Sequence, residues 1–224
     1  MKSQRDVASK VKKFYLSLAK DKHHRYLSWE HCYDYFGQSK VDTDKACLHL
    51  AFYLASWGMY RGSSFLLWKD YLIHEEVVVK LLEKIHLRKV NANYSELDID
   101  EIVELCDWVR DWYKFNVGKV NGKDKPINPT NTLVTKIILG ALGCIPAYDR
   151  YFIDGLRNME IEPLNYSREG IGTLVKFYIS NKIQFDSLQA EIKTIGGRTY
   201  PAMKLIDMYF WQIGSEQDRK EEAV

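Results

Sequence analysis

Asp149 is the residue whose type and position best suit chemistry in this chain of 224 residues. It follows an apolar segment, residues 135–142, and a short turn that contains glycine and proline. This order predicts that Asp149 stands at the start of a helix, where a carboxylate either caps free backbone N–H groups or serves a site. Both interpretations stay open, and Lys136 or Arg150 could be the partner of a purely structural cap.

A second unusual stretch covers residues 57–64, where two glycines bracket large side chains between apolar helical segments. It suggests the wall of a pocket, in which Trp57 or Tyr60 stacks on a planar group. Arg61 would then contact a phosphate or the edge of a base. The alternative is an ordinary helix junction, with Arg61 bound to the last carbonyl groups of a helix.

Other kinds of chemistry lack their sequence signatures. There is no glycine-rich phosphate loop, no Gly-x-Gly-x-x-Gly after a strand and no Gly-x-Ser-x-Gly elbow. The six histidines form no His-Glu-x-x-His pair, and the four cysteines form no Cys-x-x-Cys pair. We therefore expect neither a metal ion nor a cofactor.

The elements that position these residues are predicted to be helices. Apolar residues recur at helical spacing through most of the chain, whereas period-two alternation is nearly absent. The sequence predicts an all-α fold of eight to ten helices, including a short one capped by Ser28 and one long helix over residues 65–86. A Gly/Pro/Lys-rich segment, residues 117–129, predicts a single domain with two lobes, 1–117 and 118–224.

The composition is that of an ordinary globular protein, with 46% hydrophobic and 28% charged residues and a net charge of +2. So small a charge produces no strong field toward nucleic acid. Aromatic residues, at 13%, are numerous enough to suit stacking on bases or sugars. No signal peptide or apolar run of about 18 residues is recognisable, so we expect a cytoplasmic protein that does not span a membrane.

The segment from residue 131 to residue 152 resembles the helix-hairpin-helix DNA glycosylases. In that superfamily an apolar helix leads through a Gly/Pro turn to an aspartate at the next helix start. The resemblance implies that Asp149 is the catalytic carboxylate, placed near C1′ of a nucleotide flipped out of the duplex. It also implies a pocket for the flipped base, for which the candidates are Trp57, Tyr60, Arg61 and Tyr148.

Two departures from the family pattern are visible. The Gly-x-Gly hairpin that grips a DNA phosphate is absent from residues 125–131, so other side chains would have to contact DNA. The position of the nucleophilic lysine of lyase members falls on Asn131 or Thr132, which implies a monofunctional enzyme that uses water. The candidates for DNA contact are Lys123, Lys125, Asn131, Lys136 and Arg150.

The sequence therefore predicts a divergent DNA glycosylase, a hydrolase that removes a damaged or modified base from double-stranded DNA. Divergence raises the hypothesis of a hypermodified phage base and a role in antiviral defence. We expect a monomer, although nothing in the sequence fixes the oligomeric state. Two alternatives remain: a non-catalytic helical protein that binds nucleic acid or protein, and a nucleoside or sugar hydrolase that does not act on DNA.

Overall fold

The computed structural model describes residues 6–221, and over that range the chain forms ten α-helices and three short 3₁₀ helices. Two isolated β-bridges, and no strand, occur among these residues. The prediction of an all-α fold of eight to ten helices is confirmed. None of the helices in this range is both long enough and apolar enough to cross a bilayer.

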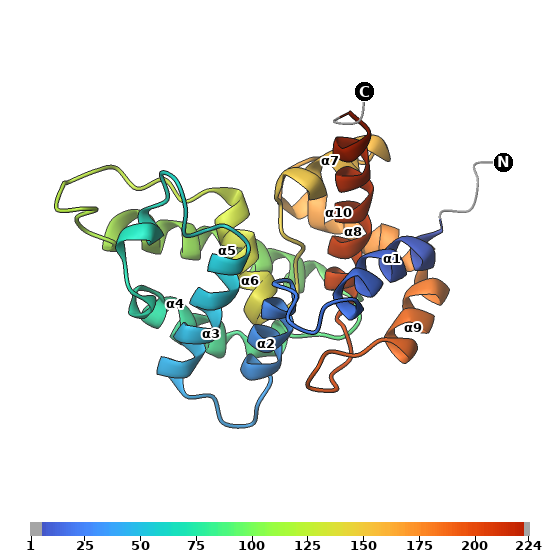
Figure 1. Ribbon diagram of the computed structural model, residues 1–224, viewed down its shortest axis with the longest axis horizontal. Coiled ribbons are helices and arrows are strands. Elements are labelled where there is room, and N and C mark those ends of the chain that lie inside the picture. Colours follow the sequence, from blue (N-terminus) through green and yellow to red (C-terminus); the bar gives the residue numbers. More distant parts are fainter. Residues whose placement is uncertain (1–5, 222–224) are drawn as a thin grey trace.

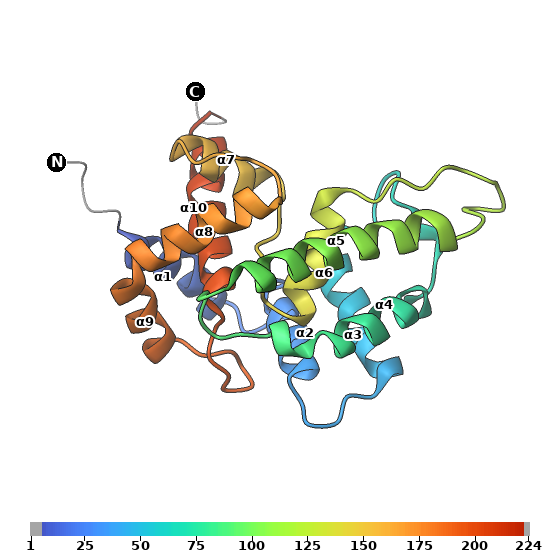
Figure 2. The ribbon, with the colours of Figure 1, turned by 180° about the vertical axis from the view of Figure 1, so that it is seen from behind.

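A first group of helices lies on the left of Figure 1. Its members are α2 (Leu27–Phe36), α3 (Thr43–Ser56), α4 (Glu75–Glu83), α5 (Glu96–Asn116) and α6 (Asn131–Ala141). Helix α6 packs against α2, α3 and α5, and Figure 2 shows α5 crossing it. The first group is thus built around α6.

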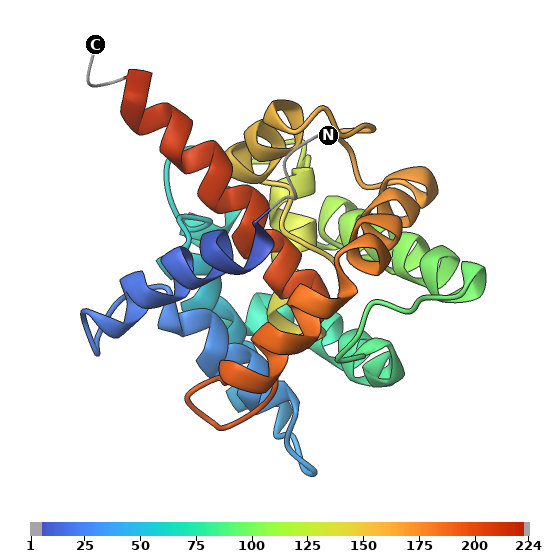
Figure 3. The same ribbon diagram turned by 90° about the vertical axis from the view of Figure 1, so that its right-hand side faces the viewer.

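A second group of helices lies on the right of Figure 1. Its members are α1 (Val7–Ala19), α7 (Arg150–Asn158), α8 (Arg168–Ser180), α9 (Lys182–Glu191) and α10 (Ala202–Glu221). Helix α10 packs against α7, α1, α8 and α9, and Figure 3 shows α1 crossing it. The expected boundary at residues 117 and 118 falls inside the first group, between α5 and α6, and α1 belongs with the C-terminal helices.

Helix α6 is buried on all sides, as its sequence predicts. Every residue from Leu133 to Ala141 is buried, and the core that surrounds the helix is continuous across both groups. The indole N–H of Trp29 donates to the carbonyl of Leu139 at 3.0 Å. A Cβ at Gly140 would overlap the ring of Tyr53, so glycine at this position allows α3 to approach closely.

The turn after α6 carries the chain to α7 in a fixed conformation. Gly143 has φ +66°, which favours glycine, and its N–H reaches the Ile138 carbonyl at 3.2 Å. Further along, Thr135 Oγ1 accepts from the Tyr148 N–H at 2.9 Å, and Thr132 Oγ1 donates to the Tyr148 carbonyl at 2.8 Å. These side chains of α6 hold the backbone next to Asp149.

Helices α7 and α10 approach each other closely because of two glycines. A Cβ at Gly155 would overlap the carbonyl oxygen of Phe210, and a Cβ at Gly214 would overlap that of Tyr151. Any side chain at either position would force the helices apart. The pair of glycines therefore fixes how the start of α7 faces α10.

Two of the predicted elements differ from the structure. The long helix expected over residues 65–86 is divided into η1 (Phe65–Trp68), η2 (Tyr71–His74), α4 and η3 (Ile85–Leu87). Ser64 and Asp70 accept from the N–H groups of Leu66 and Leu72, so each begins a short turn. Ser28, the expected cap, lies instead inside α2, which begins at Leu27.

Candidate functional site

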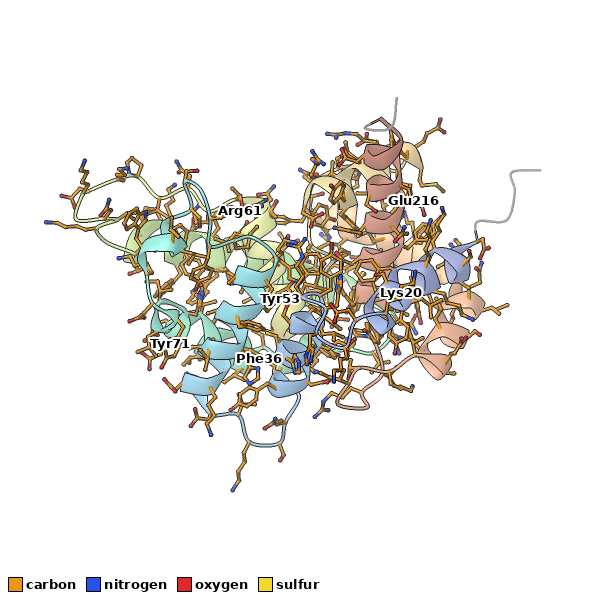
Figure 4. The ribbon with its side chains drawn as sticks, in the orientation of Figure 1. Lys20, Phe36, Tyr53, Arg61, Tyr71 and Glu216 are labelled. Atoms are coloured by element: carbon orange, nitrogen blue, oxygen red, sulfur yellow. The ribbon has the colours of Figure 1, made fainter. Side chains whose placement is uncertain are left out.

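A cavity of about 620 Å³ lies where the two groups of helices meet, and we call it the Asp149 cavity. Its lining comes from the segment before α2, the end of α3, one side of α6, the start of α7 and α10. Figure 4 shows Arg61, one of the lining residues, at the notch between the first group and α7 and α10. Trp57 and Arg61 therefore share a cavity with Asp149.

Asp149 uses its two carboxylate oxygens for different contacts. Oδ1 accepts from the Phe152 N–H at 3.1 Å, so Asp149 is the N-cap of α7, one of the two roles that the sequence leaves open. Oδ2 accepts from the Lys136 ammonium at 2.7 Å. The Asp149 side chain is 16% exposed, whereas that of Lys136 is only 3% exposed. The cap and a site on the cavity are thus compatible, because one oxygen serves each.

Aromatic rings form one wall of the cavity. Trp57 stacks on Tyr26, with ring centroids 4.4 Å apart and an angle of 17° between the planes. Trp211 meets Tyr26 edge-on at 5.6 Å and Tyr151 edge-on at 5.0 Å. The Lys136 ammonium lies 4.6 Å from the centroid of Trp57. Stacked rings beside a cation suit a flat, electron-rich ligand group.

Positive charge predominates in the lining. Among the residues described, four basic ones line the cavity (Arg25, Arg61, Lys136 and Arg150), and Asp149 is the sole acidic one. Arg150 pairs with Asp218 at 2.6 Å across the gap between α7 and α10. The Arg61 side chain makes no hydrogen bond or ion pair with the described part of the chain. The cavity is therefore suited to an anionic ligand such as a phosphate.

Two residues proposed for the pocket from the sequence lie outside its lining. The Tyr60 hydroxyl is 2.8 Å from Nε2 of His74, whose Nδ1 is 2.5 Å from the Tyr113 hydroxyl. Burial lowers the pKa of His74 to about 3 and raises that of Tyr60, so this network is neutral. Tyr148 is buried, and its ring packs against Phe152. Both residues therefore support the fold around the cavity.

The residues proposed for DNA contact are divided between two places. Lys136 and Arg150 line the Asp149 cavity. Lys123 and Lys125 are exposed in the loop before α6, and Lys125 lines a second cavity described below. Asn131 accepts from the Arg110 guanidinium at 3.0 Å. In place of a Gly-x-Gly hairpin, this loop ends at Thr130, whose side chain caps α6.

Sequence reasoning missed several residues of the lining, among them Arg25, Tyr26 and Trp211. Arg25 and Tyr26 precede α2 in a polar segment, and Trp211 stands in an apolar helix where it resembles a core residue. No local pattern distinguishes them, because only the fold brings both segments to Trp57. Among residues 6–221, no group of three or more His, Cys, Asp or Glu side chains could hold a metal ion.

No protein-family model, characterised protein or solved structure matches this chain. The chemistry of the Asp149 cavity is therefore the basis for inferring a function.

Proposed function

We propose that this protein is a DNA glycosylase, a hydrolase that breaks the N-glycosidic bond of a modified base. The observation that carries the proposal is the meeting of Asp149, the stacked Tyr26–Trp57 pair and four basic side chains in one cavity. Such a cavity offers a carboxylate for the sugar, an aromatic wall for the base and cations for the phosphates.

In the proposed reaction the base leaves with the electron pair of its bond to C1′, and the sugar acquires oxocarbenium-like positive charge. The Asp149 carboxylate stabilises that charge and accepts a proton from the water that adds to C1′. The proton then passes from Asp149 to the departing base, so the products are a neutral free base and an abasic site in an intact strand. Because a stacked base is out of reach, the nucleotide must be flipped into the cavity.

Lys136 would orient the carboxylate in this reaction. Its ammonium lies 2.7 Å from Asp149 Oδ2 and against the ring of Trp57, so it fixes the side on which the carboxylate meets the sugar. An ammonium held in this ion pair has no free electron pair with which to attack C1′. The contact therefore supports water as the nucleophile, and thus the monofunctional reaction.

The substrate class that we propose is a hypermodified base such as those that some phages carry in their DNA. The Asp149 cavity falls within the range of about 300–1,000 Å³ in which proteins bind small molecules. Loss of such bases would leave an invading genome full of abasic sites. The enzyme would then act in antiviral defence, on double-stranded DNA with the target nucleotide flipped out.

The first test is incubation of the protein with plain, uracil-containing, oxidised, alkylated and glucosylated-cytosine DNA. Strand cleavage that appears only after alkali measures abasic sites. We expect abasic sites from one class of substrate and a loss of at least about 100-fold in rate for Asp149→Asn, the order found when one electrostatic contact to a transition state is removed. Strand breaks before alkali would contradict the water mechanism, and no abasic sites from any DNA would overturn the proposal.

A matched variant separates chemistry from stability in this test. Asn is as good an N-cap as Asp, but Asp149→Asn leaves the Lys136 ammonium buried without its carboxylate, which is costly. The double variant Asp149→Asn/Lys136→Met removes both charges and should recover most of the lost stability. If it is as stable as the wild type and still inactive, the carboxylate serves catalysis. If activity returns with stability, Asp149 is only structural.

The two alternative functions predict other results. A nucleoside hydrolase would cleave free nucleosides and would bind a DNA duplex no more tightly at low salt than at high salt. A non-catalytic binding protein would retain DNA or a partner protein without releasing a base, and Asp149→Asn would leave that binding unchanged. Free nucleosides and a salt series are therefore included in the same experiment.

A further inference from the structure

A second cavity, of about 630 Å³, adjoins the Asp149 cavity. Both cavities are lined by Gly58, Met59 and Arg61, so these three residues form the wall between them. The first turn of α6 also contributes to both: Leu133 lines the second cavity, and Thr132 lines the Asp149 cavity. Two cavities of this size in succession offer more room than one unmodified base requires.

The Arg61 side chain covers the wall between the cavities at Gly58. This glycine has φ +78° and no side chain, and the nearest atoms to a Cβ placed there belong to the Arg61 side chain, at 3.0 Å or more. Arg61 is exposed and unpaired within the described residues, so it can move without losing an ion pair. A group attached to a base in the Asp149 cavity could therefore pass over Gly58.

The lining of the second cavity combines an apolar floor with a rim of hydrogen-bond donors. Phe65, Ile127 and Leu133 are buried apolar residues of the floor. The exposed side chains of Arg61, Ser63, Lys125 and Asn128 supply guanidinium, hydroxyl, ammonium and amide groups. No carboxylate of residues 6–221 lines this cavity.

We infer that the second cavity holds a hexose attached to the base that is removed, an assignment that rests on the proposed glycosylase function. A pyranose ring has apolar C–H faces and a rim of hydroxyl groups, which match the floor and the donors of the cavity. The phosphate of a neighbouring nucleotide would pair with the cations of Arg61 and Lys125. It would make no favourable contact with the apolar floor. The substrate class is thus a glycosylated pyrimidine, here 5-hydroxymethylcytosine with glucose on its hydroxymethyl oxygen.

The test compares duplexes of one sequence that carry cytosine, 5-hydroxymethylcytosine or glucosylated 5-hydroxymethylcytosine at the same position. The variant Asn128→Trp places a large side chain in the second cavity at an exposed position that makes no hydrogen bond to the described residues. Asn93→Trp, an equal change at an exposed loop residue away from both cavities, is its matched control. Each protein is assayed for abasic sites, and kcat/KM is measured for each duplex.

We expect the wild type to prefer the glucosylated base over the hydroxymethylated one by at least about tenfold in kcat/KM, because a site that hydrogen-bonds a group discriminates against its absence. Asn128→Trp should lower kcat/KM at least about tenfold on the glucosylated base alone, and Asn93→Trp should change neither. Equal rates for the two bases, or equal losses on both in Asn128→Trp, would overturn the hexose assignment and favour a neighbouring nucleotide in the second cavity. Abasic sites from none of these duplexes would refute the assignment, and if the wider DNA panel is also blank, the glycosylase function fails with it.

Discussion

Two buried lysine–aspartate pairs lie against the same tryptophan, and they differ in their access to solvent. Lys136 binds Asp149 and Lys204 binds Asp207, each at 2.7 Å, and the two ammonium groups lie 4.6 and 5.5 Å from the ring centroid of Trp57. Both side chains of the Lys204–Asp207 pair are nearly inaccessible, at 4% and 5% exposure. Asp149, by contrast, opens on a cavity.

The difference indicates what each pair does. We call Lys204–Asp207 the closed pair. Asp207 also accepts from the Ala147 N–H at 3.0 Å, so the closed pair ties α10 to the turn that leads to Asp149. The ammonium of Lys204 is surrounded by the rings of Phe14, Trp29 and Trp57 and has no route to a ligand. A lysine–aspartate ion pair therefore stabilises the fold at Lys204 and Asp207. At Lys136 and Asp149 the same kind of ion pair is accessible to a substrate.

The largest expected effect comes from breaking the closed pair. Asp207→Asn keeps an acceptor for the Ala147 N–H but leaves Lys204 charged and unpaired in the core. We expect a loss of about 3–5 kcal/mol in the free energy of unfolding, the usual cost of removing one partner of a buried pair. Urea unfolding followed by tryptophan fluorescence measures it. Asp149→Asn should cost less, because Asp149 is partly exposed.

The double variant Lys204→Met/Asp207→Asn is the control for this prediction. Methionine can pack among the three rings, and replacing a buried pair by apolar groups is often neutral or stabilising. The double variant should therefore be more stable than Asp207→Asn alone. A single variant that loses less than about 1 kcal/mol would show that the closed pair contributes as little as a surface pair. A double variant no more stable than Asp207→Asn would show that the loss does not come from an unpaired Lys204.

The sequence predicts those features around the two lysine–aspartate pairs that depend on residues close together in the chain. The burial of α6, the glycine at its end and the helix start at Asp149 follow from local pattern, and Lys136 is one of the two partners that the sequence offers for Asp149. The closed pair could not be predicted, because Lys204 and Asp207 resemble an ordinary i,i+3 surface pair within α10. Their burial depends on α1 and α2 returning to cover them, which is a contact between distant segments.

Glu30 is a third buried carboxylate, and it lacks a lysine. Its oxygens accept from the Tyr200 hydroxyl and from the Ile195 N–H, which ties α2 to the loop before α10. Burial raises the pKa of Glu30 above its ordinary value of 4.5, and the nearby charge of Asp34 acts in the same direction. The hydrogen bonds and the neighbouring His31 lower the pKa in part. Without a cation, burial is the dominant influence.

This raised pKa predicts a smaller, pH-dependent effect on stability. Between the unfolded and the folded pKa the native state binds more protons, so the contribution of Glu30 is complete below its ordinary pKa of 4.5 and is lost as pH rises through the folded pKa. Glu30→Gln cannot titrate and should lose less stability than the wild type between pH 4 and pH 8. Urea unfolding across that range tests it, and parallel curves for the two proteins would contradict the prediction.

The smallest expected effect concerns the charge at the mouth of the Asp149 cavity. Arg150 and Arg157 both lie on α7, are similarly exposed and pair with aspartates, Asp218 at 2.6 Å and Asp154 at 2.7 Å, but only Arg150 lines the Asp149 cavity. If Arg150 contacts a DNA phosphate, Arg150→Ala should weaken duplex binding and reduce the slope of log K against log salt by about one, whereas Arg157→Ala should leave the slope unchanged. Fluorescence anisotropy over a salt series measures both. Equal slopes of log K against log salt for the two variants would mean that Arg150 serves only its pair with Asp218. The DNA strand would then have to approach the cavity from the side of Arg25 and Arg61.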